Sequence, residues 1–185
     1  MLRLAAQAPR RLRPLSSNVR RHMNDHRVEI SIPAPLYTLF DATRSGKPEV
    51  VVVNEALLAF PHAEVFSWHL RITLDARELV ENGMPSPAES EVLFHIGDEI
   101  ESLVLSGRTA HNAENALFLA RSTWDGCREL LFQVHDPEVT HVALQELLGS
   151  RAWGRSWDYR MTNDPEWSNA ANLFQLFPQA RGSDA

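Results

Sequence analysis

The chain has 185 residues, a mass of 20.9 kDa and a formal net charge of −6. This length suits one domain, and 44% hydrophobic with 23% charged residues excludes collagen-like, low-complexity and wholly disordered proteins. The single cysteine, Cys127, excludes an intramolecular disulfide and a zinc site built from several thiolates. No run of residues approaches the roughly 18 apolar positions that a membrane-spanning helix needs.

The charge is unevenly distributed along the chain. Residues 1–24 hold six arginines and no acidic residue, so the other 12 basic and 24 acidic residues give −12 over 25–185. We interpret residues 1–25 as a basic disordered leader; the alternatives are a true start at Met23 and a mitochondrial transit peptide. Seventeen arginines against one lysine favour a bacterial source, and no secretory signal precedes the domain, which predicts a cytoplasmic location.

Two short apolar segments, residues 36–42 and 49–54, flank a turn-like Arg-Ser-Gly-Lys-Pro run and predict a hairpin. Residues 64–74 then alternate between apolar and polar side chains, which predicts a strand. Its core face would carry Phe66, Trp68, Leu70, Ile72 and Leu74, and its exposed face Ser67, His69, Arg71 and Thr73.

A helix is predicted from Pro87 to about Leu105. Ser86 suits the N-cap and Glu89 would complete a capping box. One face of this helix is apolar, with Val92, Leu93, Ile96, Ile100, Leu103 and Val104. The other face is mainly polar, with Glu91, His95, Asp98, Glu99 and Ser102.

The second half of the chain repeats the order of strand and helix. Residues 116–124 and 127–134 predict two strands joined by Asp125-Gly126, a type I′ turn signal. Asp136 would cap a second helix that ends at Gly149. A last strand is predicted near 153–161 and a short terminal helix follows. The predicted apolar positions are Val139, Val142, Ala143 and Leu147 in the second helix, Trp153, Trp157, Tyr159 and Met161 in the strand, and Trp167, Ala170, Phe174 and Phe177 in the terminal helix.

From residue 64 the order is therefore strand, helix, strand, strand, helix, strand. This is the split βαβ, or ferredoxin-like, pattern of an α+β sandwich, with one antiparallel sheet and two helices on one face. The N-terminal hairpin would extend the sheet. We predict one domain over 26–177 and a disordered tail over 178–185.

No catalytic motif emerges, and we assign no catalytic residue, cofactor or metal. Glu91, His95, Asp98 and Glu99 on the first helix are candidate partner-binding residues; three of them lie four apart, so a cation site is the alternative. His69 and Arg71 are candidates for a binding patch on the open sheet face. Cys127 is expected to be structural, because Arg128 would point to the opposite face of the strand.

Several turn, cap and strand signatures together resemble one family. They are residues 68–74, Asn82-Gly83-Met84-Pro85-Ser86 with Glu89, Asp98, Asp125-Gly126, Arg128-Glu129-Leu130-Leu131-Phe132, Asp158-Tyr159 and Asp164-Pro165-Glu166-Trp167. In this order they resemble the bacterial domain of unknown function 695, over residues 36–177. That family is similar to the regulator-of-ribonuclease-E-activity B group, so the resemblance implies a ferredoxin-like fold and, by fold analogy, binding and restraint of an enzyme. The family has no established catalytic motif, so no active-site residue is carried over.

Three functions follow as hypotheses. The first is a non-catalytic interaction or regulatory domain whose acidic surface binds a basic protein, such as a nuclease. The second is nucleic-acid binding through the open sheet, which the acidity and the absence of aromatics beside His69 and Arg71 disfavour. The third is a metal-assisted hydrolase using Glu91, His95 and Asp98 or Glu99.

Overall fold

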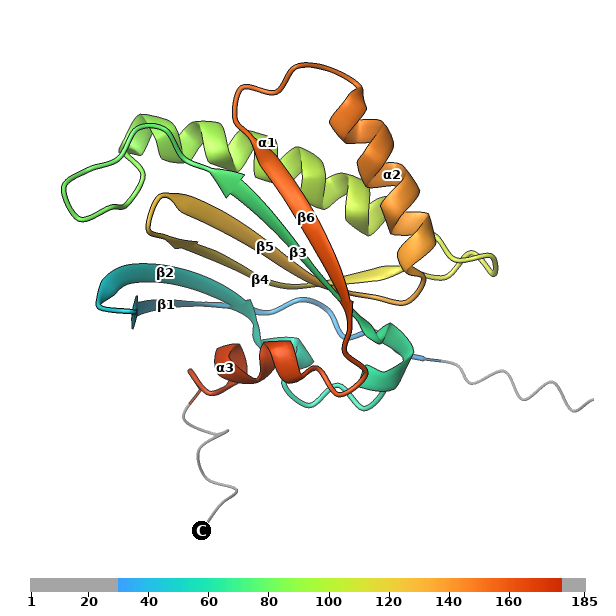
Figure 1. Ribbon diagram of the computed structural model, residues 1–185. Coiled ribbons are helices and arrows are strands. Elements are labelled where there is room, and N and C mark those ends of the chain that lie inside the picture. Colours follow the sequence, from blue (N-terminus) through green and yellow to red (C-terminus); the bar gives the residue numbers. More distant parts are fainter. Residues whose placement is uncertain (1–29, 178–185) are drawn as a thin grey trace, which may run out of the picture. The chain divides into compact units, whose positions relative to one another are not determined.

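The computed structural model describes residues 30–177 (Figure 1). The described residues from Ser31 onward belong to one compact unit. The predicted leader, 1–25, and tail, 178–185, lie outside the described residues. Within the described part of the chain, no helix is long and apolar enough to cross a membrane.

The domain has an α+β architecture built on a six-stranded sheet in which every neighbouring pair is antiparallel. The strand order is β1-β2-β4-β5-β3-β6. The elements are β1 (Tyr37–Arg44), β2 (Lys47–Asn54), η1 (Glu55–Leu57), η2 (Ala63–Phe66), β3 (Trp68–Asp75), α1 (Pro87–Ser106), β4 (Ala116–Trp124), β5 (Cys127–Val134), α2 (Pro137–Gly149), β6 (Trp157–Asn163), η3 (Ser168–Ala170) and α3 (Ala171–Phe174).

Local turn and cap signals predict several boundaries correctly. Asp125 and Gly126 both have positive φ, 41° and 76°, as a two-residue type I′ turn requires, and Ser45-Gly46 repeats this geometry between β1 and β2. The Ser86 hydroxyl accepts a hydrogen bond from the Glu89 amide at 3.1 Å, which confirms the predicted N-cap of α1.

Other boundaries differ from the prediction because distant contacts override the local pattern. The strand predicted over 64–74 begins at Trp68; before it, Phe66 turns into η2 and packs against Phe60. The strand predicted near 153–161 begins at Trp157, whose ring meets that of Trp153 edge to face. The predicted terminal helix is only the short pair η3 and α3. Helix α2 ends at Gly149 as predicted, and Ser150 is its C-cap.

Helices α1 and α2 pack on the same face of the sheet, as Figure 1 shows. Leu93 and Ile100 of α1 and Leu144 of α2 are fully buried in one hydrophobic core with side chains of β3, β4, β5 and β6. Two residues assigned to apolar helix faces are nevertheless exposed: Val92 by 36% and Val142 by 47%. Within the described residues, this core includes no side chain of β1 or β2.

The opposite face of the sheet has its own, smaller apolar cover. The rings of Phe40 and Phe177 meet with centroids 4.8 Å apart, and Trp167 stacks on Phe60. The indole Nε1–H of Trp167 lies within hydrogen-bonding distance of two carbonyls, those of Ala63 and Phe66. The segment containing η3 and α3 thus packs against η2 and one end of this face, which we call the helix-free face because α1 and α2 lie on the other side.

A buried ion pair joins the start of α1 to the segment before β6. The Glu89 carboxylate, 1% exposed, accepts two hydrogen bonds of 2.6 Å from the Arg155 guanidinium and one from the Arg77 amide. Because Glu89 is engaged there, the expected capping box does not form, and the Ser86 amide donates to the Glu78 carbonyl instead. The hydrogen bonds from Arg155 lower the pKa of Glu89 to about 2.

We expect Glu89→Gln to lower the free energy of unfolding at neutral pH, because the Arg155 charge loses its buried partner. A depressed carboxyl pKa contributes stability above the ordinary value of 4.5, and that contribution is lost as the pH falls toward about 2. Urea unfolding at several pH values should therefore show the difference between wild type and variant shrinking in acid. Glu138→Gln, at an exposed first-turn position of α2, is the matched control. A difference in the free energy of unfolding between wild type and Glu89→Gln that stays constant from pH 7 to pH 2 would contradict this account.

Candidate functional site

The four acidic-face candidates on α1 do not form one cluster. Asp98 accepts a 2.9 Å hydrogen bond from Arg121 on β4, whereas Glu99 pairs with Arg151, which follows α2. Glu91 and His95 are exposed. Within residues 30–177, no three His, Cys, Asp or Glu side chains lie close enough together to hold a metal ion, so the hydrolase hypothesis lacks a metal site in this part of the chain.

A different surface forms where α1 faces the first hairpin. The side chains of β1 that point to the helix side are all exposed, including Tyr37 by 48% and Leu39 by 61%. Opposite them, α1 presents a stripe at helical spacing that includes the 44% exposed Phe94. We call this the α1–β1 surface and define it by Tyr37, Leu39, Val50, Val52, Phe94, Asp98, Glu101 and Leu105.

Arg121 ties the two sides of the α1–β1 surface together. It pairs with Val52 of β2 across the sheet, and its guanidinium donates to Asp98 and Glu101, each at 2.9 Å. The same group lies over the Phe94 ring, 5.0 Å from its centroid. Burial and then Glu101 raise the pKa of Tyr37, while Arg121 opposes this. The surface is therefore apolar with a rim of carboxylates.

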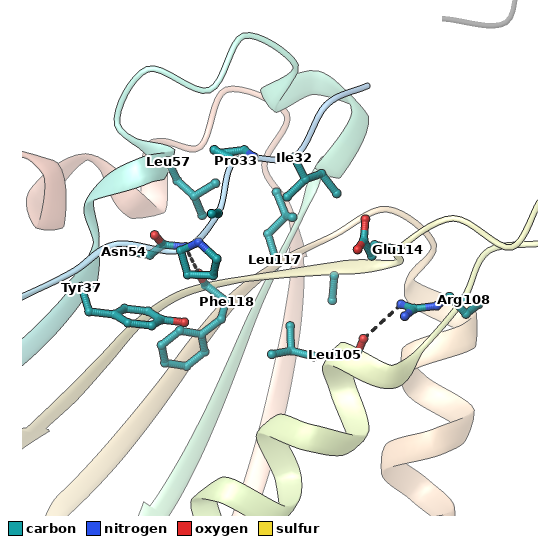
Figure 2. A pocket seen from close by; sticks show the side chains of 13 residues that line it. Ile32, Pro33, Tyr37, Asn54, Leu57, Leu105, Arg108, Glu114, Leu117 and Phe118 are labelled. Carbon is teal, nitrogen blue, oxygen red and sulfur yellow. Dashed lines mark hydrogen bonds between the residues drawn. The ribbon is translucent and has the colours of Figure 1, made fainter. Parts of the chain in front are cut away.

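One end of the α1–β1 surface deepens into a cavity of about 420 Å³ (Figure 2). Figure 2 shows Tyr37 and Phe118 side by side, with ring centroids 6.0 Å apart, below the extended segment that contains Pro33. Arg108 and Glu114 are the charged residues of its wall, and Arg108 donates to the Leu105 and Gly107 carbonyls at the end of α1. Most of the lining is apolar, so the cavity suits an aliphatic or aromatic side chain.

Sequence reasoning missed the α1–β1 surface because it depends on which strands the helices cover. The alternation of β1 indicates two faces but does not show that both stay partly open. The run from Val50 to Val53 is apolar at every position. The sequence therefore does not indicate that alternate valines face opposite sides of the sheet. Exposure of Phe94 could have been suspected, since it lies on the polar side of the predicted helix.

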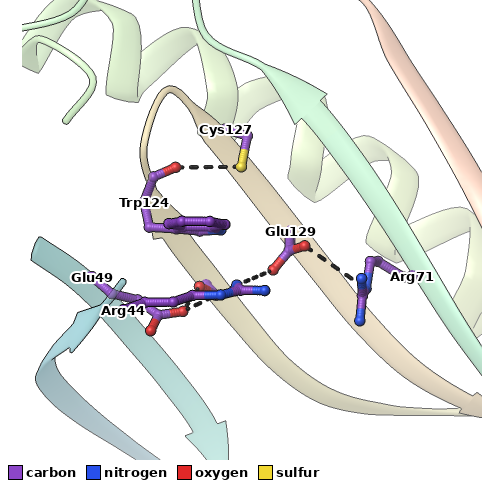
Figure 3. A network of polar contacts seen from close by, with 7 residues as sticks. Arg44, Glu49, Arg71, Trp124, Cys127 and Glu129 are labelled. Carbon is purple, nitrogen blue, oxygen red and sulfur yellow. Dashed lines mark hydrogen bonds and ion pairs between the residues drawn. The ribbon is translucent and has the colours of Figure 1, made fainter. Parts of the chain in front are cut away.

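The helix-free face carries a polar network at its open end (Figure 3). Glu129, 8% exposed, accepts a 2.8 Å hydrogen bond from Arg44 and lies 3.8 Å from Arg71. Figure 3 shows the Arg44 guanidinium beneath the Trp124 ring, 4.1 Å from its centroid. Glu49 adds a second carboxylate 3.5 Å from Arg44. This network links β1, β2, β4, β5 and β3.

The two sheet-face candidates lie on this face but differ in exposure. Arg71 is exposed as predicted. His69, predicted to be exposed, is only 4% exposed, because the η3 segment covers its end of the sheet. Burial and then the nearby Arg71 lower the pKa of His69 to about 4, so its imidazole is neutral at physiological pH.

Neither Cys127 nor His135 has the setting of a catalytic group. The Cys127 thiol lies 3.3 Å from the Trp124 carbonyl, and burial, reinforced by Glu129, raises its pKa to about 11. The Nδ1 atom of His135 lies 2.7 Å from the Val65 carbonyl, which holds the ring against η2. Both side chains are therefore engaged in contacts between neighbouring segments.

Comparison with known proteins assigns the domain to a family. The model of the family of unknown function DUF695 matches residues 38–173. The chain belongs to this family. The match covers β1 through most of α3, including both faces described above. Neither a search of curated proteins nor one of solved structures found a match.

We expect Cys127 of this DUF695 domain to react slowly with iodoacetamide. A pKa of about 11 against an ordinary 9.0 reduces the thiolate fraction at pH 8 about a hundredfold. The rate constant for alkylation should therefore be at least that much smaller in the native protein than in urea, as measured by mass spectrometry over time. Similar rates in the two states would contradict a raised thiol pKa in the native protein.

Proposed function

We propose that this DUF695 domain is a non-catalytic protein-interaction module that binds an extended, basic segment of a partner along β1 and the α1–β1 surface. The observation that carries the proposal is the exposure of Tyr37 and Leu39 on an eight-residue edge strand beside an apolar cavity. Contiguous exposed apolar side chains of this kind are typical of binding surfaces.

The outer edge of β1 supports the proposal. Every residue of β1 pairs with β2, and within the described residues no strand pairs with the other side of β1. An unpaired edge presents backbone amides and carbonyls that an extended peptide can use as an added strand. Alternate side chains of that peptide would then lie on the α1–β1 surface, and one would reach the cavity beside Tyr37.

Charge supports a basic partner. Residues 30–177 contain 10 basic and 21 acidic residues, a net charge of −11. Near the docking surface, Asp41 is exposed on β1 and Glu114 lines the cavity. Asp98 and Glu101 pair with Arg121, and Arg128 lies over the Phe94 ring beside them. Arginine and lysine of a partner would meet these carboxylates at the rim. Glu91 extends the acidic surface along α1. His95 and Glu99, which lie on the same helix, join the proposed partner-binding residues.

The topology is the basis for a narrower version of the proposal. Helix α1 connects β3 to β4 and α2 connects β5 to β6, and these strands lie in the order β4-β5-β3-β6. We infer from this order a ferredoxin-like unit extended by the β1–β2 hairpin, related to the regulator-of-ribonuclease-E-activity B group. On that analogy the partner is a cytoplasmic bacterial enzyme, such as a nuclease, that the domain restrains.

Nucleic-acid binding through the helix-free face has less support. Base stacking needs exposed rings beside cations. Phe60, Trp167 and Phe177 are only 5–8% exposed, and Arg44, which lies over Trp124, is engaged by Glu129 and Glu49. The strongly negative net charge also repels phosphate.

The proposal predicts binding of a short peptide of alternating valine and arginine, and no comparable binding of one alternating valine and glutamate. Leu39→Arg should weaken the affinity about tenfold or more, because it removes apolar contact and adds a repelling charge at the surface. Fluorescence polarisation measures the affinity, and raised salt should weaken it. Hydrogen exchange should show new protection of β1 amides.

The control is Val142→Arg, which makes the same kind of change at an exposed apolar position of α2. It should leave peptide affinity within twofold of wild type. Equal affinity for the two peptides would reject the α1–β1 surface as the docking site. An equal loss of peptide affinity in Leu39→Arg and Val142→Arg would reject it as well.

A further inference from the structure

A small polar cavity opens on the helix-free face, apart from the proposed docking surface. Its volume is about 240 Å³, and it is lined by His69, Arg71, Arg160, Thr162 and Asn169. Three elements contribute: β3 supplies His69 and Arg71, β6 supplies Arg160 and Thr162, and η3 supplies Asn169. Because His69 pairs directly with Thr162 across the two strands, their side chains share this face.

The buried wall of the cavity has polar atoms without partners. His69 is 96% buried, and neither ring nitrogen has a hydrogen-bond partner within the described residues. Its cross-strand neighbour on β5, Gln133, is fully buried, and its amide nitrogen and oxygen are unpartnered as well. Buried polar groups are nearly always hydrogen-bonded in folded proteins, so four such atoms side by side call for a polar ligand or for ordered water.

The mouth of the cavity is cationic. Arg160 is exposed and takes part in none of the ion pairs found in residues 30–177. Arg71 has only the 3.8 Å contact with Glu129, which Arg44 engages more closely at 2.8 Å. Both guanidinium groups therefore keep donors for another anion.

The nearest carboxylate at the inner end does not compete for these donors. Asp164 is 6% exposed, and it accepts hydrogen bonds from the Ser168 and Asn169 amides and from the Asn169 side chain. These bonds hold η3 over the end of the sheet and lower the pKa of Asp164 against the effect of burial. They also place Asn169 at the rim of the cavity.

We propose that this cavity is a binding site for a compact oxyanion, a carboxylate or phosphate group, held between Arg71 and Arg160. Two guanidinium groups supply charge-assisted hydrogen bonds, and Thr162 and Asn169 supply neutral ones. A neutral His69 donates from one ring nitrogen to the anion's inner oxygen and accepts a hydrogen bond at the other.

Titration of the full-length protein with inorganic phosphate and, separately, with succinate tests the proposal. Calorimetry measures affinity, and the ring resonances of His69 in ¹H–¹⁵N spectra report contact at the buried wall. Saturable binding of either anion with a shift of the His69 ring supports the site. Tighter binding of phosphate identifies a phosphate-bearing ligand, and tighter binding of succinate a carboxylate.

Matched variants separate this site from general attraction of anions. Arg160→Gln should weaken binding about tenfold or more, whereas Arg151→Gln, an exposed arginine on the helix side, should leave it unchanged. His69→Leu should abolish binding without lowering the midpoint of urea unfolding, because a leucine there leaves no unpartnered nitrogen. No saturable response to either anion, or equal losses in the two arginine variants, would overturn the proposal and leave water as the partner of His69 and Gln133.

Discussion

The domain depends on a mismatch between the width of its sheet and the cover that two helices provide. Strands lie about 4.8 Å apart, so the five spacings of a six-stranded sheet span about 24 Å, whereas two helices about 10 Å wide cover about 20 Å. Helices α1 and α2 therefore cover β4, β5, β3 and β6, whose side chains build the hydrophobic core. The hairpin β1–β2 completes the sheet but receives no helix of its own. Exposure of Tyr37 and Leu39 follows from this geometry rather than from any local irregularity of β1.

The same reasoning explains why the helix-free face divides into two regions. The segment from Trp167 to Phe177 is too short to cover a whole sheet face, and its aromatic rings bury one end, around Phe40 and Phe60. At the uncovered end, charged side chains of four strands, β1, β2, β3 and β5, neutralise one another around Glu129. His69 lies at the boundary, under the last apolar cover and beside the first arginine. A cavity with a buried polar wall and a cationic mouth is what such a boundary produces.

How far the sequence predicts this structure depends on the range of the interaction. The Asp125-Gly126 turn and the Ser86 cap are predicted correctly because backbone conformation within a few residues determines them. Glu89 fits a capping box by spacing, yet its carboxylate binds Arg155, 66 residues away, and no local pattern indicates that partner. Alternation correctly assigns His69 to the face opposite Leu70, but burial of that face depends on η3. Of the residues that line the small polar cavity, the sequence pattern places His69 and Arg71 on one face of the strand. Arg160 and Thr162 join them only through the register of β3 with β6, and Asn169 through the position of η3.

The position of His69 makes its unpartnered nitrogens informative. On an edge strand, a histidine can turn its ring into water, but β3 is hydrogen-bonded to β5 on one side and β6 on the other. Its ring is fixed between Gln133 and Thr162, so rotation about the side-chain bonds offers few ways to satisfy both nitrogens within the protein. An apolar residue at this position would continue the burial around Phe66 and Trp167 at no such cost. A buried position that carries an unsatisfied polar group is characteristic of functional sites. The arginines at the cavity mouth indicate that such a site would bind a negatively charged group.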